Sequence, residues 1–141
     1  MERRIDLITL RVDDLEAATR AYVEGLGWEP ILAVPGEVTF LQLGPGQVLA
    51  LFVASGFDAD VGPTVDLAFN FGQVVETEAE VDRVVGELID AGGRVLKEPQ
   101  HADWGGYHGL ALDGAGCCWE IARNPGWSVA PDGTVSIGAV G

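Results

Sequence analysis

The sequence has few basic residues: 8 lysines and arginines stand against 22 aspartates and glutamates, which gives a formal net charge of -14. This shortage of positive charge excludes a surface built to bind phosphate backbones or anionic membranes. The acidic residues are spread along the chain and form no single tail, so we interpret them as a solubilising surface. We therefore expect no nucleic-acid partner and no membrane partner.

Cysteine and long apolar runs are also scarce. The two cysteines, Cys117 and Cys118, are neighbours and cannot join distant parts of the chain, which is typical of a reducing cytoplasm. No apolar run approaches about 18 residues and the first residues lack a signal-peptide core, so we expect a cytoplasmic protein. The 20 glycines include no phosphate-binding motif between a strand and a helix, which excludes a nucleotide-binding loop.

What the sequence does contain is apolar material for one core, since 48% of its 141 residues are hydrophobic and this length suits a single domain. Residues 5–53 predict the order strand, helix and three strands. Apolar residues alternate over 5–12, and a helix with Asp13 as its N-cap follows and ends at Gly25 and Gly27. The three further strands are predicted at residues 28–34, 38–43 and 48–53.

The same order recurs over residues 65–123, after a polar, glycine-bearing linker at 55–63. A strand over 65–71 precedes a helix that begins with a capping box of Thr77 and Glu80. The remaining strands are predicted at 94–97, 107–112 and 117–122, and residues 124–141 form a C-terminal tail. Two βαβββ modules predict an α+β domain with helices outside and a cavity enclosed by the other face of the sheet. A non-repeating α+β sandwich is the alternative.

Several separated motifs carry a resemblance to a known family. They are Val12-Asp13-Asp14-Leu15, Gly25-Leu26-Gly27, the run over 104–110 and the run over 113–121. With these motifs in this order, the chain resembles the vicinal oxygen chelate superfamily, which includes glyoxalase, bleomycin-resistance proteins and extradiol dioxygenases. The resemblance extends over about residues 5–125 and implies one domain over 1–141. It does not define the function, because this fold hosts many chemistries.

In metal-using members, the resemblance implies one ligand from the first strand and one from the last strand of each module. These positions are occupied here by Leu7, Ala50, Asp66 and Glu120. Leucine and alanine cannot coordinate a cation, so we expect no metal cofactor. If a divalent metal is bound after all, Asp66 and Glu120 would hold it, with water completing the shell.

Strand alternation predicts which side chains face the cavity. This set mixes an apolar wall with a few polar anchors, as small-molecule pockets do: Leu7, Thr9, Arg11, Val48, Ala50, Phe52, Asp66, Ala68, Asn70, Cys118 and Glu120. The register over 107–110 leaves open whether His108 or Tyr107 points inward. Trp28, Trp104 and Tyr107 are candidates for stacking on a ligand, with core or dimer packing as the alternative, which we prefer for Trp28.

Three side chains in this set have alternative chemical roles. His108 could act as an acid, a base or a ligand, or be tied to a neighbouring carbonyl as a structural residue. Cys118 could act as a nucleophile only if a base such as His108 generated its thiolate. Glu120 could instead be a partly buried acid paired with Arg11.

The leading hypothesis is a metal-free small-molecule-binding protein that resembles the bleomycin-resistance branch. Its ligand would be cationic or aromatic, because Asp66 and Glu120 outnumber Arg11 in the expected cavity. The expected ligand-binding residues are Arg11, Phe52, Asp66, Asn70, Trp104, Tyr107, His108, Cys118 and Glu120.

The competing hypothesis is an enzyme. It would be either a metal-dependent lyase, isomerase or dioxygenase, or a metal-free acid–base catalyst that uses His108 and Glu120. A third hypothesis is an interaction module without a ligand. The sequence names no substrate. We also expect a homodimer, because the resemblance implies paired modules and because Trp127 would be costly to leave in water.

Overall fold

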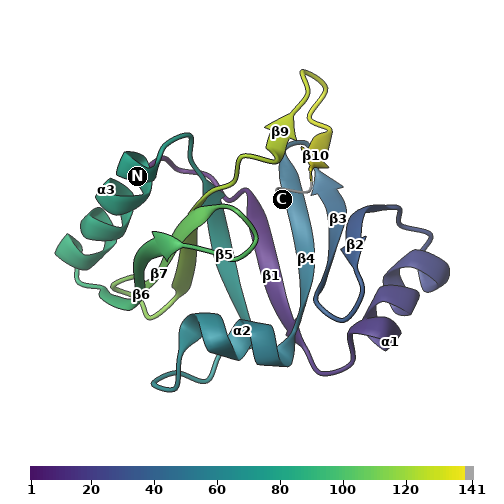
Figure 1. Ribbon diagram of the computed structural model, residues 1–141, viewed down its shortest axis with the longest axis horizontal. Helices are drawn as coiled ribbons and strands as arrows, with labels where there is room; N and C mark the ends of the chain where they lie inside the picture. Colours follow the sequence, from purple (N-terminus) through teal and green to yellow (C-terminus); the bar gives the residue numbers. More distant parts are fainter. Residues whose placement is uncertain (139–141) are drawn as a thin grey trace.

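The structure is a computed structural model that describes residues 1–138. Its main element is an eight-stranded sheet with the strand order β2-β3-β4-β1-β5-β8-β7-β6 (Figure 1). The first half supplies β1 (Leu7–Val12), β2 (Pro30–Val34), β3 (Val38–Gly44) and β4 (Gln47–Val53). The second half supplies β5 (Phe69–Val74), β6 (Arg94–His101), β7 (Tyr107–Leu112) and β8 (Cys118–Arg123).

The two halves join edge to edge through the antiparallel pair β1–β5, in which Leu7 lies opposite Gly72 and Thr9 opposite Asn70. Each half also contains one parallel pair, β1–β4 and β5–β8. A Cβ atom at position 72 would lie 2.2 Å from Cδ2 of Leu7, so a larger residue there would force the Leu7 side chain to shift. The arrangement confirms the predicted α+β fold of two βαβββ modules.

One face of the sheet, the outer face, is covered by a helix from each half. Helix α1 (Leu15–Arg20) continues as the π-helix η1 (Ala21–Gly25), and α3 (Glu78–Asp90) packs on the second half. The predicted capping box is confirmed, because Oγ1 of Thr77 accepts a hydrogen bond from the backbone N–H of Glu80 at 3.1 Å. The N-cap of α1 is Asp14 and not Asp13, since Asp14 Oδ1 accepts from Ala17 N at 2.9 Å.

The opposite face, called the inner face below, is defined by the side chains of Leu7, Val48 and Cys118. A third helix, α2 (Ala54–Val61), covers part of it, where the sequence predicted a linker at 55–63. Phe57 and Val61 lie one helical turn apart and pack in one buried cluster with Cys118. The linker prediction was wrong because this apolar pair gives the segment a buried face.

The predicted C-terminal tail is ordered over the described residues and forms the hairpin of β9 (Trp127–Val129) and β10 (Val135–Ile137). Val135 and Trp127 pack against Leu7 and Val48 of the inner face. The chain itself therefore covers much of Trp127, and this residue no longer supports a homodimer. The last three residues of the predicted tail lie outside the described residues. Within residues 1–138, no helix is long and apolar enough to cross a membrane.

Strand β5 begins four residues later than the predicted strand over 65–71. Its pairing with β1 begins where Phe69 lies opposite Leu10, and this pairing decides where the strand starts. Val65 and Leu67 instead pack against the cluster around α2. The apolar alternation from Val65 to Phe71 therefore joins two groups of residues. Val65 and Leu67 pack near α2, whereas Phe69 and Phe71 belong to β5.

Candidate functional site

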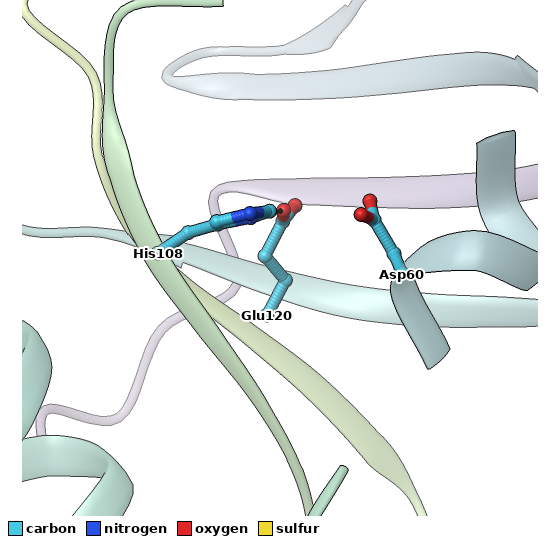
Figure 2. A group of neighbouring side chains, drawn as sticks. All are labelled: Asp60, His108 and Glu120. Atoms are coloured by element: carbon cyan, nitrogen blue, oxygen red, sulfur yellow. Dashed lines mark hydrogen bonds and ion pairs between the residues drawn. The ribbon is translucent and has the colours of Figure 1, made fainter. Parts of the chain in front are cut away.

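The inner face carries a hydrogen-bonded pair, His108 of β7 and Glu120 of β8. Nδ1 of His108 lies 2.7 Å from Oε2 of Glu120, and Figure 2 shows the two side chains meeting tip to tip. In the antiparallel register, Leu110 of β7 lies opposite Glu120 of β8. His108 is two residues before Leu110, so its side chain is on the same face of the sheet as that of Glu120. His108 is only 2% exposed.

Tyr107 points the other way and lies on the outer face. Its hydroxyl donates to Oδ1 of Asp82 on α3 at 2.7 Å, and its ring packs against the cluster under that helix. This hydrogen bond raises the pKa of Tyr107 to about 12. The open question of register is thus settled for His108, and the expectation that Tyr107 lines the cavity is corrected.

A second acidic group, Asp60, joins this pair from helix α2. Potential ligand atoms of Asp60, His108 and Glu120 all lie within 4.8 Å of one another (Figure 2). Nζ of Lys97 on β6 donates to Oδ1 of Asp60 at 2.8 Å. Neither Asp60 nor Lys97 was expected at the site from the sequence. The sequence did contain a signal for Asp60. Phe57 and Val61 are spaced as on one face of a helix, and Asp60 is next to Val61.

Asp66 does not belong to the site. It is exposed and precedes the start of β5, so the expectation that it faces the cavity is corrected. Asn70 takes that position, because it precedes the N-cap Thr77 by as many residues as Leu7 precedes the N-cap Asp14. Asn70 is 3% exposed, and its Oδ1 has no hydrogen-bond partner within the described residues. Such an atom calls for a donor.

Arg11 has other partners than Glu120. Its Nε donates to Oδ1 of Asp58 at 2.8 Å, and its guanidinium also bonds to Asp13 at 2.9 Å. The alternative pairing of Glu120 with Arg11 is therefore corrected, since His108 is the residue that meets Glu120. Phe52 lies on the inner face as predicted and packs beside α2.

The remaining predicted site residues differ in accessibility. Trp104 is 40% exposed, and its ring meets that of His108 edge-on with 5.5 Å between centroids. Cys118 is buried, and burial together with the negative charge of Glu120 raises the pKa of its thiol to about 12. The nucleophile hypothesis for Cys118 is therefore unsupported at neutral pH. Trp28 packs with Tyr22 in the outer core, as preferred from the sequence.

Burial and charge compete at His108. Burial disfavours the imidazolium, but the hydrogen bond to Glu120 and the negative charges of Glu120 and Asp60 outweigh it, so the pKa of His108 is raised. The same burial, with the repulsion of Glu120, raises the pKa of Asp60, while Lys97 opposes this shift. The cluster therefore holds charges that partly neutralise one another.

This shift predicts a pH dependence of stability. Because the pKa of His108 is higher in the folded protein than in the unfolded chain, its protonated form stabilises the fold. The stabilisation is fully present below the unfolded pKa of about 6.5 and is lost as the pH rises through the folded pKa. We expect the free energy of unfolding, measured in urea, to fall as the pH rises above this value. His108→Gln should remove this fall, whereas His101→Gln, an exposed control, should retain it. Equal slopes in the two variants would contradict the assignment.

The residues at the metal positions implied by the resemblance do not fit a chelating site. Leu7 and Ala50 offer only hydrocarbon, Asn70 offers a neutral amide, and Glu120 alone is charged. The cluster of Asp60, His108 and Glu120 has suitable spacing for a cation. However, the ammonium of Lys97 already contacts Asp60 and would repel a divalent metal.

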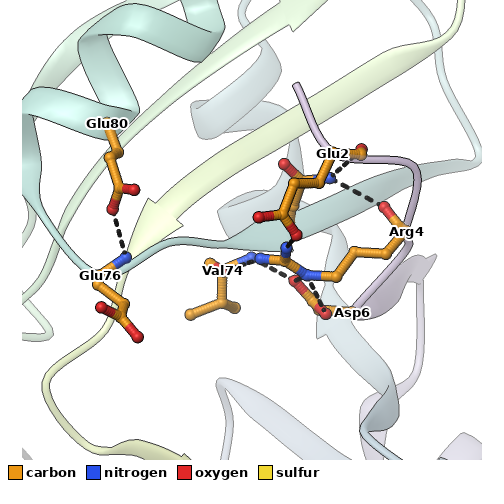
Figure 3. Close-up of polar contacts among 7 residues, drawn as sticks. Glu2, Arg4, Asp6, Val74, Glu76 and Glu80 are labelled. Atoms are coloured by element: carbon orange, nitrogen blue, oxygen red, sulfur yellow. Dashed lines mark hydrogen bonds and ion pairs between the residues drawn. The ribbon is translucent and has the colours of Figure 1, made fainter.

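Two clefts in the described part of the chain lie away from this cluster. One, of about 790 Å³, includes Arg4, Val74 and Glu80, and the other, of about 460 Å³, lies between β2 and β10. Figure 3 shows how Arg4 is used: its Nε donates to Asp6 at 3.0 Å, and its guanidinium also contacts Glu2 and the carbonyl of Val74. Arg4 thus holds the N-terminal segment against β5. Neither cleft contains the unpartnered atom of Asn70.

Several solved structures are similar to this chain. A glyoxalase-related enzyme from Fulvimarina pelagi is 36% identical, over 98% of this chain and 100% of that chain, with a TM-score of 0.48. An NAD-dependent benzaldehyde dehydrogenase from Legionella pneumophila is 18% identical, over 83% of this chain and 96% of that chain, with a TM-score of 0.67. The Mn(II)-bound glyoxalase from Novosphingobium aromaticivorans is 18% identical, over 94% of this chain and 40% of that chain, with a TM-score of 0.59. The last two show a similarity of fold alone.

The family assignment rests on the match to a family model. No curated protein matches the chain. The model of the Glyoxalase/Bleomycin resistance protein/Dioxygenase superfamily matches residues 4–121, which cover most of both modules. The chain therefore belongs to the glyoxalase/bleomycin resistance protein/dioxygenase superfamily.

Proposed function

We propose that the protein binds a small organic molecule on its inner face without a metal, that Asp60 and Glu120 anchor this ligand, and that the buried His108 holds Glu120 in position. The observation that carries the proposal is the convergence of these three groups within 4.8 Å of one another. They come from α2, β7 and β8, and buried apolar residues such as Leu110 lie beside them. An apolar wall with a few convergent polar groups is the usual composition of a small-molecule site.

The chemistry of the cluster favours a ligand with a cationic group on an aromatic or apolar body. Two carboxylates, Asp60 and Glu120, can accept donors from such a group. Trp104 keeps 40% of its surface exposed beside His108, so its ring is available to a flat or cationic ligand.

The enzymatic alternatives have weaker support. For acid–base catalysis, His108 would have to reach a substrate, and its side chain is nearly inaccessible. For metal-dependent catalysis, Lys97 would have to leave Asp60 before a metal could enter. The homodimer and the cytoplasmic location remain predictions.

Binding to Glu120 can be tested with aromatic compounds matched in size that carry a positive or a negative charge. We expect the positively charged compounds to raise the melting temperature more. Glu120→Gln should weaken binding of the best compound by about 1–3 kcal/mol, the contribution of a charged hydrogen bond. Elemental analysis of the purified protein should find no stoichiometric divalent metal, and a chelator should leave the melting temperature unchanged.

Glu16→Gln on α1 is the matched control, because Glu16 is exposed and, among residues 1–138, its side chain bonds only to Arg20 on its own helix and to the backbone of no other element. This variant should bind the best compound like the unmodified protein. Equal weakening by both substitutions, or stoichiometric bound metal, would refute the proposal.

A further inference from the structure

The polar cluster of the inner face consists of two neighbouring hydrogen-bonded pairs. Lys97 donates to Asp60 at 2.8 Å, and His108 lies 2.7 Å from Glu120. The two pairs lie next to each other, and Figure 2 shows Asp60 directed from α2 toward the carboxylate of Glu120 and the ring of His108. The side chains of Lys97 and Asp60 retain 23% and 22% of their exposure, so a small molecule can reach them.

A ligand with only one charge fits this arrangement poorly. A lone cation on Asp60 would displace Lys97 and leave its ammonium half-buried without a partner. A lone anion on Lys97 would leave the carboxylate of Asp60 half-buried without a partner. Removing one member of a desolvated pair is costly, whereas replacing both partners keeps each charge compensated. A well-matched ligand therefore replaces both partners at once.

Asn70 provides an independent observation on the same face. Glu120 lies beside Gly72 in the β5–β8 register, and Asn70 is two residues before Gly72, so both side chains project from the inner face. The Oδ1 atom of Asn70 is buried and accepts no hydrogen bond within residues 1–138. An ammonium group has three donors, so it can bond to a carboxylate and still supply Asn70.

We propose that this cluster binds a dipolar ligand, a small molecule that carries both an ammonium and a carboxylate, as amino acids do. The ammonium takes the place of Lys97 on Asp60 and donates to Asn70, and the carboxylate binds the released Lys97. The body of the ligand lies toward Trp104. This inference rests on the proposed function, because it uses the same cluster, and it adds a requirement for the negative group.

Three compounds with the same aromatic body test this requirement: phenylalanine, 2-phenylethylamine and 3-phenylpropanoate. Their dissociation constants are measured by calorimetry on the full chain. We expect phenylalanine to bind about tenfold more tightly than either singly charged compound, the effect of one additional charged hydrogen bond. Lys97→Met should remove the advantage of phenylalanine over the amine, and Asp60→Asn should remove its advantage over the acid.

Arg94→Met is the matched control, because Arg94 is on the same strand as Lys97 but bonds to Thr64. It should leave all three constants unchanged, and Lys97→Arg should restore the preference for phenylalanine. Circular dichroism checks that each variant is folded. Equal binding of phenylalanine and the amine would overturn this inference and leave the proposed function intact. Failure of all three compounds to bind would overturn both.

Discussion

Replacing Phe57 with Ala should lower the free energy of unfolding by about 3–5 kcal/mol, the usual effect of truncating a fully buried phenylalanine. Phe57 is 0% exposed and packs with Val61, Leu110 and Cys118. Helix α2 has only eight residues and no side-chain N-cap, so its own hydrogen bonds cannot hold it in place. Its stability comes from this buried face.

Urea denaturation measures this effect, and Phe69→Ala is the matched control. Phe69 is 41% exposed at the start of β5, so its truncation should cost about 1 kcal/mol or less. If the two truncations cost the same, α2 is not an integral part of the core. Loss of α2 would also remove Asp60 from the candidate site, so Phe57→Ala should weaken ligand binding without touching any charged group.

Removing one partner of the pair between His108 and Glu120 should be the second large effect. Glu120→Leu or His108→Leu alone should lower the free energy of unfolding by about 1–3 kcal/mol, because each leaves a buried polar partner unsatisfied. The double variant should lose clearly less than the sum of the two, because replacing both partners with apolar groups leaves neither of them orphaned.

The exposed pair of Glu16 and Arg20 is the control for this cycle. It lies on one helix with one turn between its members, and such pairs contribute about 0.3–0.5 kcal/mol. Strictly additive effects at His108 and Glu120 would mean that the 2.7 Å contact does not couple them. Strong coupling with no loss of stability in the double variant would indicate that the pair is retained for binding.

The local elements of the fold could be predicted because their signals are local. Strand β7 has the predicted bounds, and the capping box of α3 follows from a Thr and a Glu three positions apart. The start of β5 was predicted too early because it depends on pairing with β1, which is more than fifty residues away in the sequence. The alternation of apolar residues predicts which face of a strand is buried, but it does not predict which strand pairs with it.

The site was only partly predictable for a related reason. His108, Glu120 and Asn70 were expected at the site from the sequence, but alternation alone supported Tyr107 equally. Only the packing of α3, whose Asp82 accepts a hydrogen bond from the Tyr107 hydroxyl, shows that Tyr107 faces the other way. Asp60 was missed because glycine and acidic residues made its segment resemble a linker. Charge counting alone could not show that Arg11 bonds to Asp58.

Helix α2 limits how this protein could be divided into separate chains. Asp58 bonds to Arg11 in the first half of the sheet, and Asp60 bonds to Lys97 in the second half, so one short peptide bridges both modules. Two separately produced halves, residues 1–53 and 65–138, would retain all eight strands of the sheet but would lack this bridge. Reassembly could restore the sheet but not the third member of the cluster. The segment that joins the two modules therefore supplies the carboxylate of Asp60 to the cluster, and it also holds the two modules close together.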